Sequence, residues 1–420
     1  MNKVITTFAL ALLTAGWAMA QDQAPKPRKL WLAIPIGQTK SAPATVECVI
    51  GFGPTSPVTA VAFSPDGRRL ASGGYKEVVV WDLVEGKLAC RIGAGDLGGD
   101  VRAVAFADKG KTLIAAGGIA GQSGEVKLFD FEGGKLIGAL EGPADAVQTL
   151  ACSADGKMLA AGCADSRIYV WDLPERKLVA TLKDHDDWVM KLAFSPDGKF
   201  LASASADRTL RVWKVEDWTC SNTLRETDPL HAVAFSPDNI NVAASAGGST
   251  PGLRFGRKDD RKFSKSSPTG GAVVLDMVWQ AVGKTSRIYA AFSDKTVRIL
   301  NSSGDLRAST ILQGNTDWVY AVAVSADGKR VASGGGDGAV RVWNEADGRL
   351  LATLIQTTPL KDDWLVVTPP GYFAGSSSEI IRWRPKGNPE GWLKLNDSLN
   401  QPELVAKILS GADVASPVLK

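Results

Sequence analysis

The sequence predicts an all-β protein built from one four-stranded unit that repeats along the chain. Forty-four glycines and twenty-one prolines are spread over 420 residues, which indicates many tight turns. Short turn motifs recur every 41–46 residues, and most of them contain Asp-Gly or Asp-Asn. One position of such a turn needs a positive φ, which Gly and Asn adopt at low cost. The last residues of the eight turns are Gly67, Gly110, Gly156, Gly198, Asn239, Gly283, Gly328 and Gly371.

Each unit continues from its turn into a strand of small residues and then a strand that ends in Trp or another large apolar residue. Val80-Trp81-Asp82 and Val170-Trp171-Asp172 are two of these strand ends, and Val61–Gly67 and Leu192–Gly198 are two of the first hairpins. These segments resemble the WD-repeat family, and the end of the chain is similar to that of bacterial exported members. A period of this length with four strands is typical of a β-propeller blade.

The number of blades depends on how the two ends of the chain pair. Seven complete units run from about Val58 to Ile355, and an eighth, at 364–383, has only three strands. An additional strand at 45–50 precedes Val58 by the same distance at which other fourth strands precede the next unit. We therefore expect eight blades, with a propeller at 44–385 closed by pairing of the N-terminal strand with the C-terminal blade. The alternative is seven blades with 364–383 packed outside the ring.

The remaining segments predict an exported protein. Residues 1–20 have a basic start, a short apolar run and the small-x-small site Ala18-Met19-Ala20, as in a signal peptide. A polar extension follows at 21–43. Residues 386–420 form a C-terminal tail, in which 402–409 reads as a short amphipathic helix. We expect a periplasmic or extracellular location without membrane insertion, since no apolar run is long enough to span a bilayer.

Composition excludes several classes of function. The formal net charge is +3, which is far from the basic balance of a nucleic-acid binder. The chain has two histidines and five cysteines, without a CxxC pair, so no metal site and no cofactor are expected. The cysteines are interpreted as small buried hydrophobic residues, without a bridge between Cys152 and Cys163. His231 is expected to pack in the core.

The resemblance implies a structural hydrogen-bond network in each well-formed blade. Its members are a His, a strand Ser or Thr, a turn Asp and the Trp. One unit has a complete set, which consists of His185, Ser203 or Ser205, Asp207 and Trp213. Asp165, Asp294 and Asp337 occupy the Asp position in other units, and Asn315 replaces the His in the seventh. We interpret the set as structural, and we predict no catalytic residues.

Binding residues are sought among exposed aromatic and basic positions. Trp188 and Trp318 stand at the same place in units four and seven, and Arg208 and Lys295 follow turn acids. These four residues are the candidate binding residues, because Trp and Arg often anchor interfaces. Packing between blades is the alternative for the Trp residues, and solvated turns for the basic ones. The basic stretch 254–265 is either a site for an acidic partner or a surface loop.

The function that fits these observations is a non-catalytic protein–protein interaction scaffold of the bacterial cell envelope or the cell exterior. The protein partner is not identified by the sequence, and the expected state is a monomer. The alternative is a small-ligand receptor or an enzyme that uses the central channel. That alternative requires polar side chains from several first strands, which are mostly small or apolar in this sequence.

Overall fold

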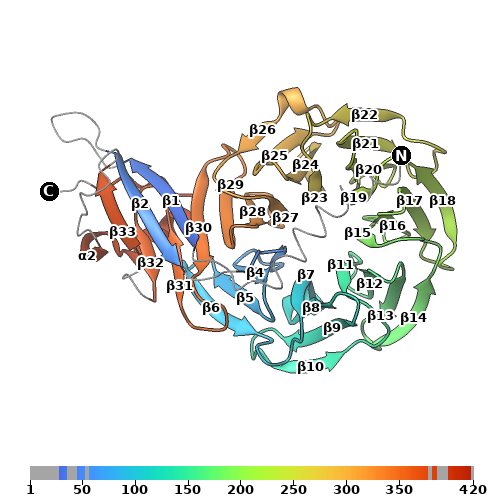
Figure 1. Ribbon diagram of the computed structural model, residues 1–420, viewed down its shortest axis with the longest axis horizontal. Helices are drawn as coiled ribbons and strands as arrows, with labels where there is room; N and C mark the ends of the chain where they lie inside the picture. Colours follow the sequence, from blue (N-terminus) through green and yellow to red (C-terminus); the bar gives the residue numbers. More distant parts are fainter. Residues whose placement is uncertain (1–27, 36–44, 53–55, 377–380, 386–395, 418–420) are drawn as a thin grey trace.

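Seven antiparallel sheets, six of four strands and one of six, stand around a central axis and form the blades of a propeller (Figure 1). The computed structural model describes residues 28–35, 45–52, 56–376, 381–385 and 396–417. In each blade we letter the strands a to d from the axis outward, and the chain visits them in that order. The a strands of successive blades contact one another around the axis.

The strands of blades 1 to 4 are β3 (Ala60–Phe63), β4 (Arg69–Gly73), β5 (Val78–Asp82), β6 (Lys87–Ile92); β7 (Asp100–Ala107), β8 (Thr112–Ile119), β9 (Ser123–Asp130), β10 (Leu136–Ala139); β11 (Val147–Cys152), β12 (Met158–Cys163), β13 (Ile168–Asp172), β14 (Lys177–Leu182); β15 (Val189–Phe194), β16 (Phe200–Ser205), β17 (Thr209–Lys214), β18 (Cys220–Arg225). Blades 5 to 7 follow with β19 (Leu230–Phe235), β20 (Asn241–Ala246), β21 (Gly252–Arg257), β22 (Lys265–Pro268); β23 (Val274–Val282), β24 (Thr285–Phe292), β25 (Val297–Asn301), β26 (Thr310–Leu312); β27 (Val319–Val324), β28 (Arg330–Gly335), β29 (Ala339–Asn344), β30 (Leu350–Gln356). Two short 3₁₀ turns, η1 (Asp108–Gly110) and η2 (Leu306–Ala308), lie between strands.

The turn between strands a and b shows why the repeated motif folds as it does. In blade 1 the hydroxyl of Ser64 donates to the Asp66 carboxylate over 2.6 Å, and the same carboxylate accepts the amide of Arg68 over 3.0 Å. Gly67 takes the positive φ that this turn requires. The same Ser–Asp hydrogen bond recurs in blades 3, 4, 5 and 7. The motif therefore fixes each hairpin locally, before any packing between blades.

The hydrophobic core lies between the blades. Each cluster of buried side chains draws on two neighbouring blades, and this holds for all seven junctions. The large residue at the end of strand c is buried in every blade. These residues are Trp81, Phe129, Trp171, Trp213, Phe255, Leu300 and Trp343. A single blade cannot bury its apolar faces, so the ring is the smallest unit that does.

The ring closes between blade 7 and blade 1, without an eighth blade. Strand β27 contacts β3, and the amide of Val58 donates to the carbonyl of Gly335 over 3.0 Å. The prediction of eight blades is therefore wrong. The seven-blade alternative describes the ring, because strand d of blade 7 is β30, which follows β29 directly in the chain.

The segments expected to form an eighth blade lie outside the ring (Figure 1). Strands β31 (Trp364–Val367) and β32 (Phe373–Gly375) extend the sheet of blade 7 to six strands. The N-terminal and C-terminal strands do pair, since β2 (Thr45–Phe52) lies antiparallel to β33 (Ile381–Pro385). With β1 (Arg28–Pro35) they form a separate three-stranded sheet, so their pairing does not close the propeller.

Two helices complete the described part of the chain. These are α2 (Asn396–Leu399) and α3 (Pro402–Leu409), and α3 coincides with the helix expected at 402–409. Val405, Ile408 and Leu409 of α3 are buried in the cluster between blades 7 and 1. Neither helix among the described residues is long and apolar enough to cross a membrane. The predicted signal peptide and most of the predicted 21–43 extension lie outside the described residues.

Candidate interaction face

One face of the propeller carries the loops between successive blades and the turns between strands b and c. We call it the loop face. The two kinds of connection meet there, because the amide of Ala206 in a b–c turn donates to the carbonyl of Trp188 over 2.9 Å. Gly336 and Trp318 repeat this contact over 2.8 Å in blade 7. The candidate residues Trp188, Trp318, Arg208 and Lys295 all belong to this face.

The blade 4 network joins the loop to the b–c turn. His185 contacts the Asp207 carboxylate through Nδ1 and the Ser203 hydroxyl through Nε2, both over 2.7 Å. The Trp213 indole donates to the same hydroxyl over 2.9 Å. Thr209 donates to the other Asp207 oxygen over 2.6 Å. Ser203, and not Ser205, is the hydroxyl that contacts the imidazole.

The electrostatics of this network are those of a buried, stabilised carboxylate. Burial by itself would raise the pKa of Asp207, but the hydrogen bond and charge of His185 and the bonds from Thr209 and the Asp186 amide outweigh it. The pKa of Asp207 therefore lies well below its usual range. Ser203 is completely buried, and a substrate cannot reach its hydroxyl. The arrangement resembles a catalytic triad in composition only.

Blade 7 holds its turn carboxylate with a different partner. Arg341, which is completely buried, donates to both oxygens of Asp337 over 3.2 and 2.8 Å. Asn315, at the position of His185, accepts from Arg341 and from Ser333 over 3.1 Å each. Burial alone would raise the pKa of Asp337, but the charge and hydrogen bonds of Arg341 lower it.

Blades 3, 5 and 6 each hold a carboxylate on the loop face with donors other than His. In blade 3 the Tyr169 hydroxyl donates to Asp165 over 2.7 Å, and in blade 6 Arg298 pairs with Asp294. Both donors stand four residues after the acid, as Arg341 does. In blade 5 the carboxylate lies on the loop instead, where Asp228 accepts the amide and hydroxyl of Thr250 over 3.1 and 2.9 Å. In blades 3, 5, 6 and 7, other donors thus hold a carboxylate where the His is absent.

The two candidate Trp residues are partly exposed, but they do not share a pocket. Trp188 lies directly before β15 of blade 4 and Trp318 directly before β27 of blade 7, three blades further around the ring. An Asp caps the amide of each, Asp187 over 2.7 Å and Asp317 over 2.8 Å. The Trp318 ring also stands 6.4 Å from the Tyr320 ring, centroid to centroid. The two Trp side chains are therefore separate, partly exposed positions on the loop face.

Arg208 and Lys295 are exposed and occupy equivalent b–c turn positions. Their φ angles are 70° and 71°, in the left-handed region that favours glycine, and Gly338 has the same place in blade 7. This placement projects the side chains from the loop face into solvent. The basic stretch 254–265 begins in strand c of blade 5 and runs through the c–d connection on the opposite side. Arg254, within strand c, is buried and pairs with Glu226 over 3.2 Å.

The inner strands carry charged groups that the sequence interpretation missed. Lys191 of blade 4 reaches across blade 5 to Asp276 of blade 6 over 2.6 Å. Arg102 of blade 2 donates to Gln148 of blade 3 over 3.0 Å. The first strands are mostly small or apolar, as expected, but these positions are exceptions. These groups could have been found in the sequence, because Arg102, Lys191 and Asp276 are ionisable residues within first strands. The Ala-Val-Ala-Phe pattern of other first strands led us to interpret the first strands as mostly small or apolar.

Burial shifts the pKa of the histidine of blade 5 and of two cysteines of blade 3. His231 is 5% exposed, and burial lowers its pKa to about 4. Burial likewise raises the pKa of Cys152 to about 11 and that of Cys163 well above its usual range. Cys90, Cys152, Cys163 and Cys220 are free thiols. Within the described ranges, no three His, Cys, Asp or Glu side chains are grouped so that they could hold a metal ion.

Comparison with known proteins agrees with this architecture. The family model described as "WD domain, G-beta repeat" matches residues 46–82, 134–172, 176–214 and 307–344. "Cross-pathway control WD-repeat protein 2" of Flammulina velutipes is 35% identical over 130 residues, which are 29% of this chain and 39% of that protein. "Telomerase protein component 1" of Rattus norvegicus is 36% identical over 117 residues, 27% of this chain and 4% of that protein.

The matches therefore cover well under two thirds of either relative, and both relatives are eukaryotic. They support the repeat family but not its bacterial exported type. Three of the matched segments begin at or just before strand d of one blade and end with strand c of the next. Four segments of the chain match the family model of WD repeats, and the described residues fold into a seven-bladed β-propeller.

Proposed function

We propose that this protein is a non-catalytic scaffold that holds a protein partner on its loop face. The observation that carries the proposal is the pair of partly exposed Trp residues, Trp188 and Trp318, on a rigid ring of hairpins. Partly exposed Trp side chains bury large apolar areas at interfaces and lose little conformational entropy there. The fold itself hosts unrelated functions, so the argument rests on the face and not on the ring.

The location that we propose is the cell envelope or the cell exterior, with the protein as a monomer. The support is the leader pattern of residues 1–20, which has a basic start and a small-residue cleavage site. Fractionation of a bacterial host, with N-terminal sequencing of the mature protein, tests it. A mature chain that starts at Gln21 supports export, and an uncleaved cytoplasmic chain contradicts it.

The interaction itself is tested by affinity capture with matched Trp variants. Trp188→Ala and Trp318→Ala each remove an aromatic anchor from the loop face. Trp218 is the control, because it is also partly exposed but lies in the c–d turn of blade 4 on the opposite face. A hot-spot Trp contributes on the order of 2 kcal/mol or more, so the loop-face variants should bind about 30-fold more weakly. Equal capture by all three variants contradicts the proposal.

A second candidate function is a small-ligand site in the channel, which the Lys191–Asp276 pair favours. The Lys191 ammonium and the Asp276 carboxylate, 2.6 Å apart on inner strands, have opposite charges. A zwitterionic or polar ligand that replaces this ion pair would contact both groups. A thermal-shift screen against sugars, amino acids and metal ions tests this function. A saturable hit that Asp276→Asn abolishes would place this function above the scaffold.

A further inference from the structure

The junction between blade 7 and blade 1 differs from the other six junctions in its covalent connection. Every other pair of adjacent blades is joined by a d–a loop, but strand β30 does not lead into strand β3. The direct contacts at this junction are nevertheless close. A Cβ on Gly334 would lie 2.5 Å from Val58 Cγ1, and Arg330 donates to the carbonyl of Gly67 over 2.6 Å. The junction is packed like the others but is not tethered.

On the loop face, the chain that leaves blade 7 contacts a buried acid of blade 1. Glu77 is 1% exposed and pairs with Arg91 of its own blade over 3.2 Å. Its Oε1 atom also accepts the Leu360 amide over 2.8 Å and the Gln356 side-chain amide. Arg91 in turn contacts Asp362 over 3.3 Å. A single buried carboxylate of blade 1 thereby holds the residues that follow β30.

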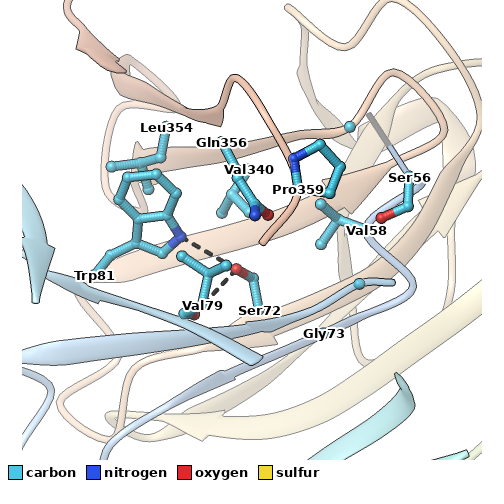
Figure 2. A pocket seen from close by; sticks show the side chains of 12 residues that line it. Ser56, Val58, Ser72, Gly73, Val79, Trp81, Val340, Leu354, Gln356 and Pro359 are labelled. Carbon is cyan, nitrogen blue, oxygen red and sulfur yellow. Dashed lines mark hydrogen bonds between the residues drawn. The ribbon is translucent and has the colours of Figure 1, made fainter. Parts of the chain in front are cut away.

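Figure 2 shows this junction from close by. Leu354, Gln356 and Pro359 approach from blade 7 and the chain after it, opposite Ser72, Val79 and Trp81 of blade 1. The Trp81 indole donates to Ser72 over 3.1 Å. The hollow between the two sides has room for about one water molecule, so it is a packing gap and not a ligand pocket.

On the opposite face, helix α3 bridges the same two blades. In the middle of the helix, Val405 and Ala406 lie against Gly86 in the c–d turn of blade 1, and a Cβ on Gly86 would come within 2.9 Å of Val405. Just beyond its end, the carbonyl of Gly411 accepts from Arg349 of blade 7 over 3.1 Å, and Arg349 also pairs with Asp413. The buried side chains of α3 complete the apolar cluster of this junction.

We propose that residues 356–363 and α3 with its C-terminal end form a strap that keeps the ring closed by clamping blades 7 and 1 on both faces. The strap replaces the missing covalent connection, because it starts in blade 7, contacts blade 1 on the loop face and returns to both blades on the other. Release of the strap opens the propeller at this junction first, while the six tethered junctions stay closed.

The experiment compares two glycines in equivalent c–d turns. Gly86 and Gly134 have φ angles of 67° and 64°, so Ala at either position strains the turn equally. A Cβ at Gly134 meets its nearest atom at 3.8 Å, whereas one at Gly86 displaces Val405. Gly86→Ala therefore releases the helix, and Gly134→Ala is its control in the full chain.

Deuterium uptake at two junction amides reports the opening. The Val58 amide bonds across the blade 7–blade 1 junction, and the Val101 amide donates to Gly74 across the tethered blade 1–blade 2 junction. We expect Gly86→Ala to speed exchange in the Val58 peptide about tenfold more than in the Val101 peptide, and Gly134→Ala to change neither selectively. Equal acceleration of both peptides, or none at Val58, overturns the proposal.

A second variant keeps the test independent of strain at Gly86. Arg349→Ala removes the anchor of the helix on blade 7 and leaves the turn of blade 1 intact. It should give the same selective exchange at Val58. If Gly86→Ala does not fold, the result with Arg349→Ala decides, and uniform protection at both junctions would contradict the strap.

Discussion

Blades 4 and 7 hold the same three residue types, Ser, Asp and Trp, at the same spacings but stabilise the turn carboxylate in opposite ways. In blade 4 the partner is an imidazole from the loop, and Arg211 points to Thr223 over 3.4 Å instead of to Asp207. In blade 7 the loop residue is Asn315, and Arg341 takes the carboxylate. The comparison teaches that a buried turn Asp needs a strong donor, while the element that supplies it can change.

The two solutions are not equally complete. The Nδ2 atom of Asn315 and the Nε atom of Arg341 are buried without a hydrogen-bond partner in blade 7. In blade 4 both ring nitrogens of His185 have partners, as do the Ser203 hydroxyl and the Trp213 indole. A buried unsatisfied donor costs about 1–3 kcal/mol. The stability of blade 7 should therefore depend more strongly on the Arg341–Asp337 ion pair than the stability of blade 4 depends on Arg211.

The largest expected effect breaks that ion pair. Arg341→Ala leaves Asp337 as a buried carboxylate without its guanidinium, which typically costs about 3–5 kcal/mol. Arg211→Ala, at the equivalent position of blade 4, should cost less than about 1 kcal/mol because Asp207 keeps its His. Urea unfolding of the two variants measures the difference. Similar losses would show that Arg341 acts through packing and not through its charge.

The next effect concerns a third arrangement, in blade 5, where His231 is buried and its pKa is lowered to about 4. The His231 imidazole takes up a proton near pH 6.5 in the unfolded chain and near pH 4 in the folded chain. Stability should therefore be fully present above pH 6.5 and fall as the pH drops toward 4, by roughly 3 kcal/mol. His231→Gln should remove this dependence. Urea unfolding at pH 7 and pH 5 tests this prediction. If the free energy of unfolding falls equally between the two pH values in the wild-type protein and in His231→Gln, the prediction is contradicted.

A smaller contrast is expected between the two loop residues. His185→Ala removes the imidazole that is the hydrogen-bond partner of both Asp207 and Ser203 and should cost about 2–3 kcal/mol. Asn315→Ala also removes a buried amide nitrogen that lacks a partner, and Arg341 still holds Asp337, so the substitution should cost less than about 1 kcal/mol. Urea midpoints of the two variants give the comparison. A larger loss at Asn315 would mean that the amide positions Arg341.

The smallest effect is expected at the b–c turns, where Arg208 and Gly338 share a positive φ. Arg208→Gly should stabilise blade 4 by up to about 1 kcal/mol, because a left-handed non-glycine residue is strained. Gly338→Ala should destabilise blade 7 by about 1 kcal/mol for the same reason. Thermal unfolding measures both. If Arg208→Gly also weakens partner capture without loss of stability, Arg208 belongs to the binding face.

Much of the molecule was determined by local sequence alone. The Ser–Asp hairpin motif, the buried residue at the end of strand c and the register of Cys152 opposite Leu159 follow from spacing and from the chemistry of one turn. The His185 network was also recognisable, because four residue types at set distances meet in one blade. These features depend on contacts within a single repeat, which the period of the sequence displays directly.

Only the tertiary structure decided the number of blades, the use of both chain ends and the partners across the channel. Seven or eight identical units have the same local pattern, and the count depends on the angle at which buried faces of neighbouring blades pack. The Lys191–Asp276 pair and the contacts of Glu77 join residues that are far apart in the chain, and no repeat period predicts them. The sequence determined the unit, and packing between units determined how the ring ends.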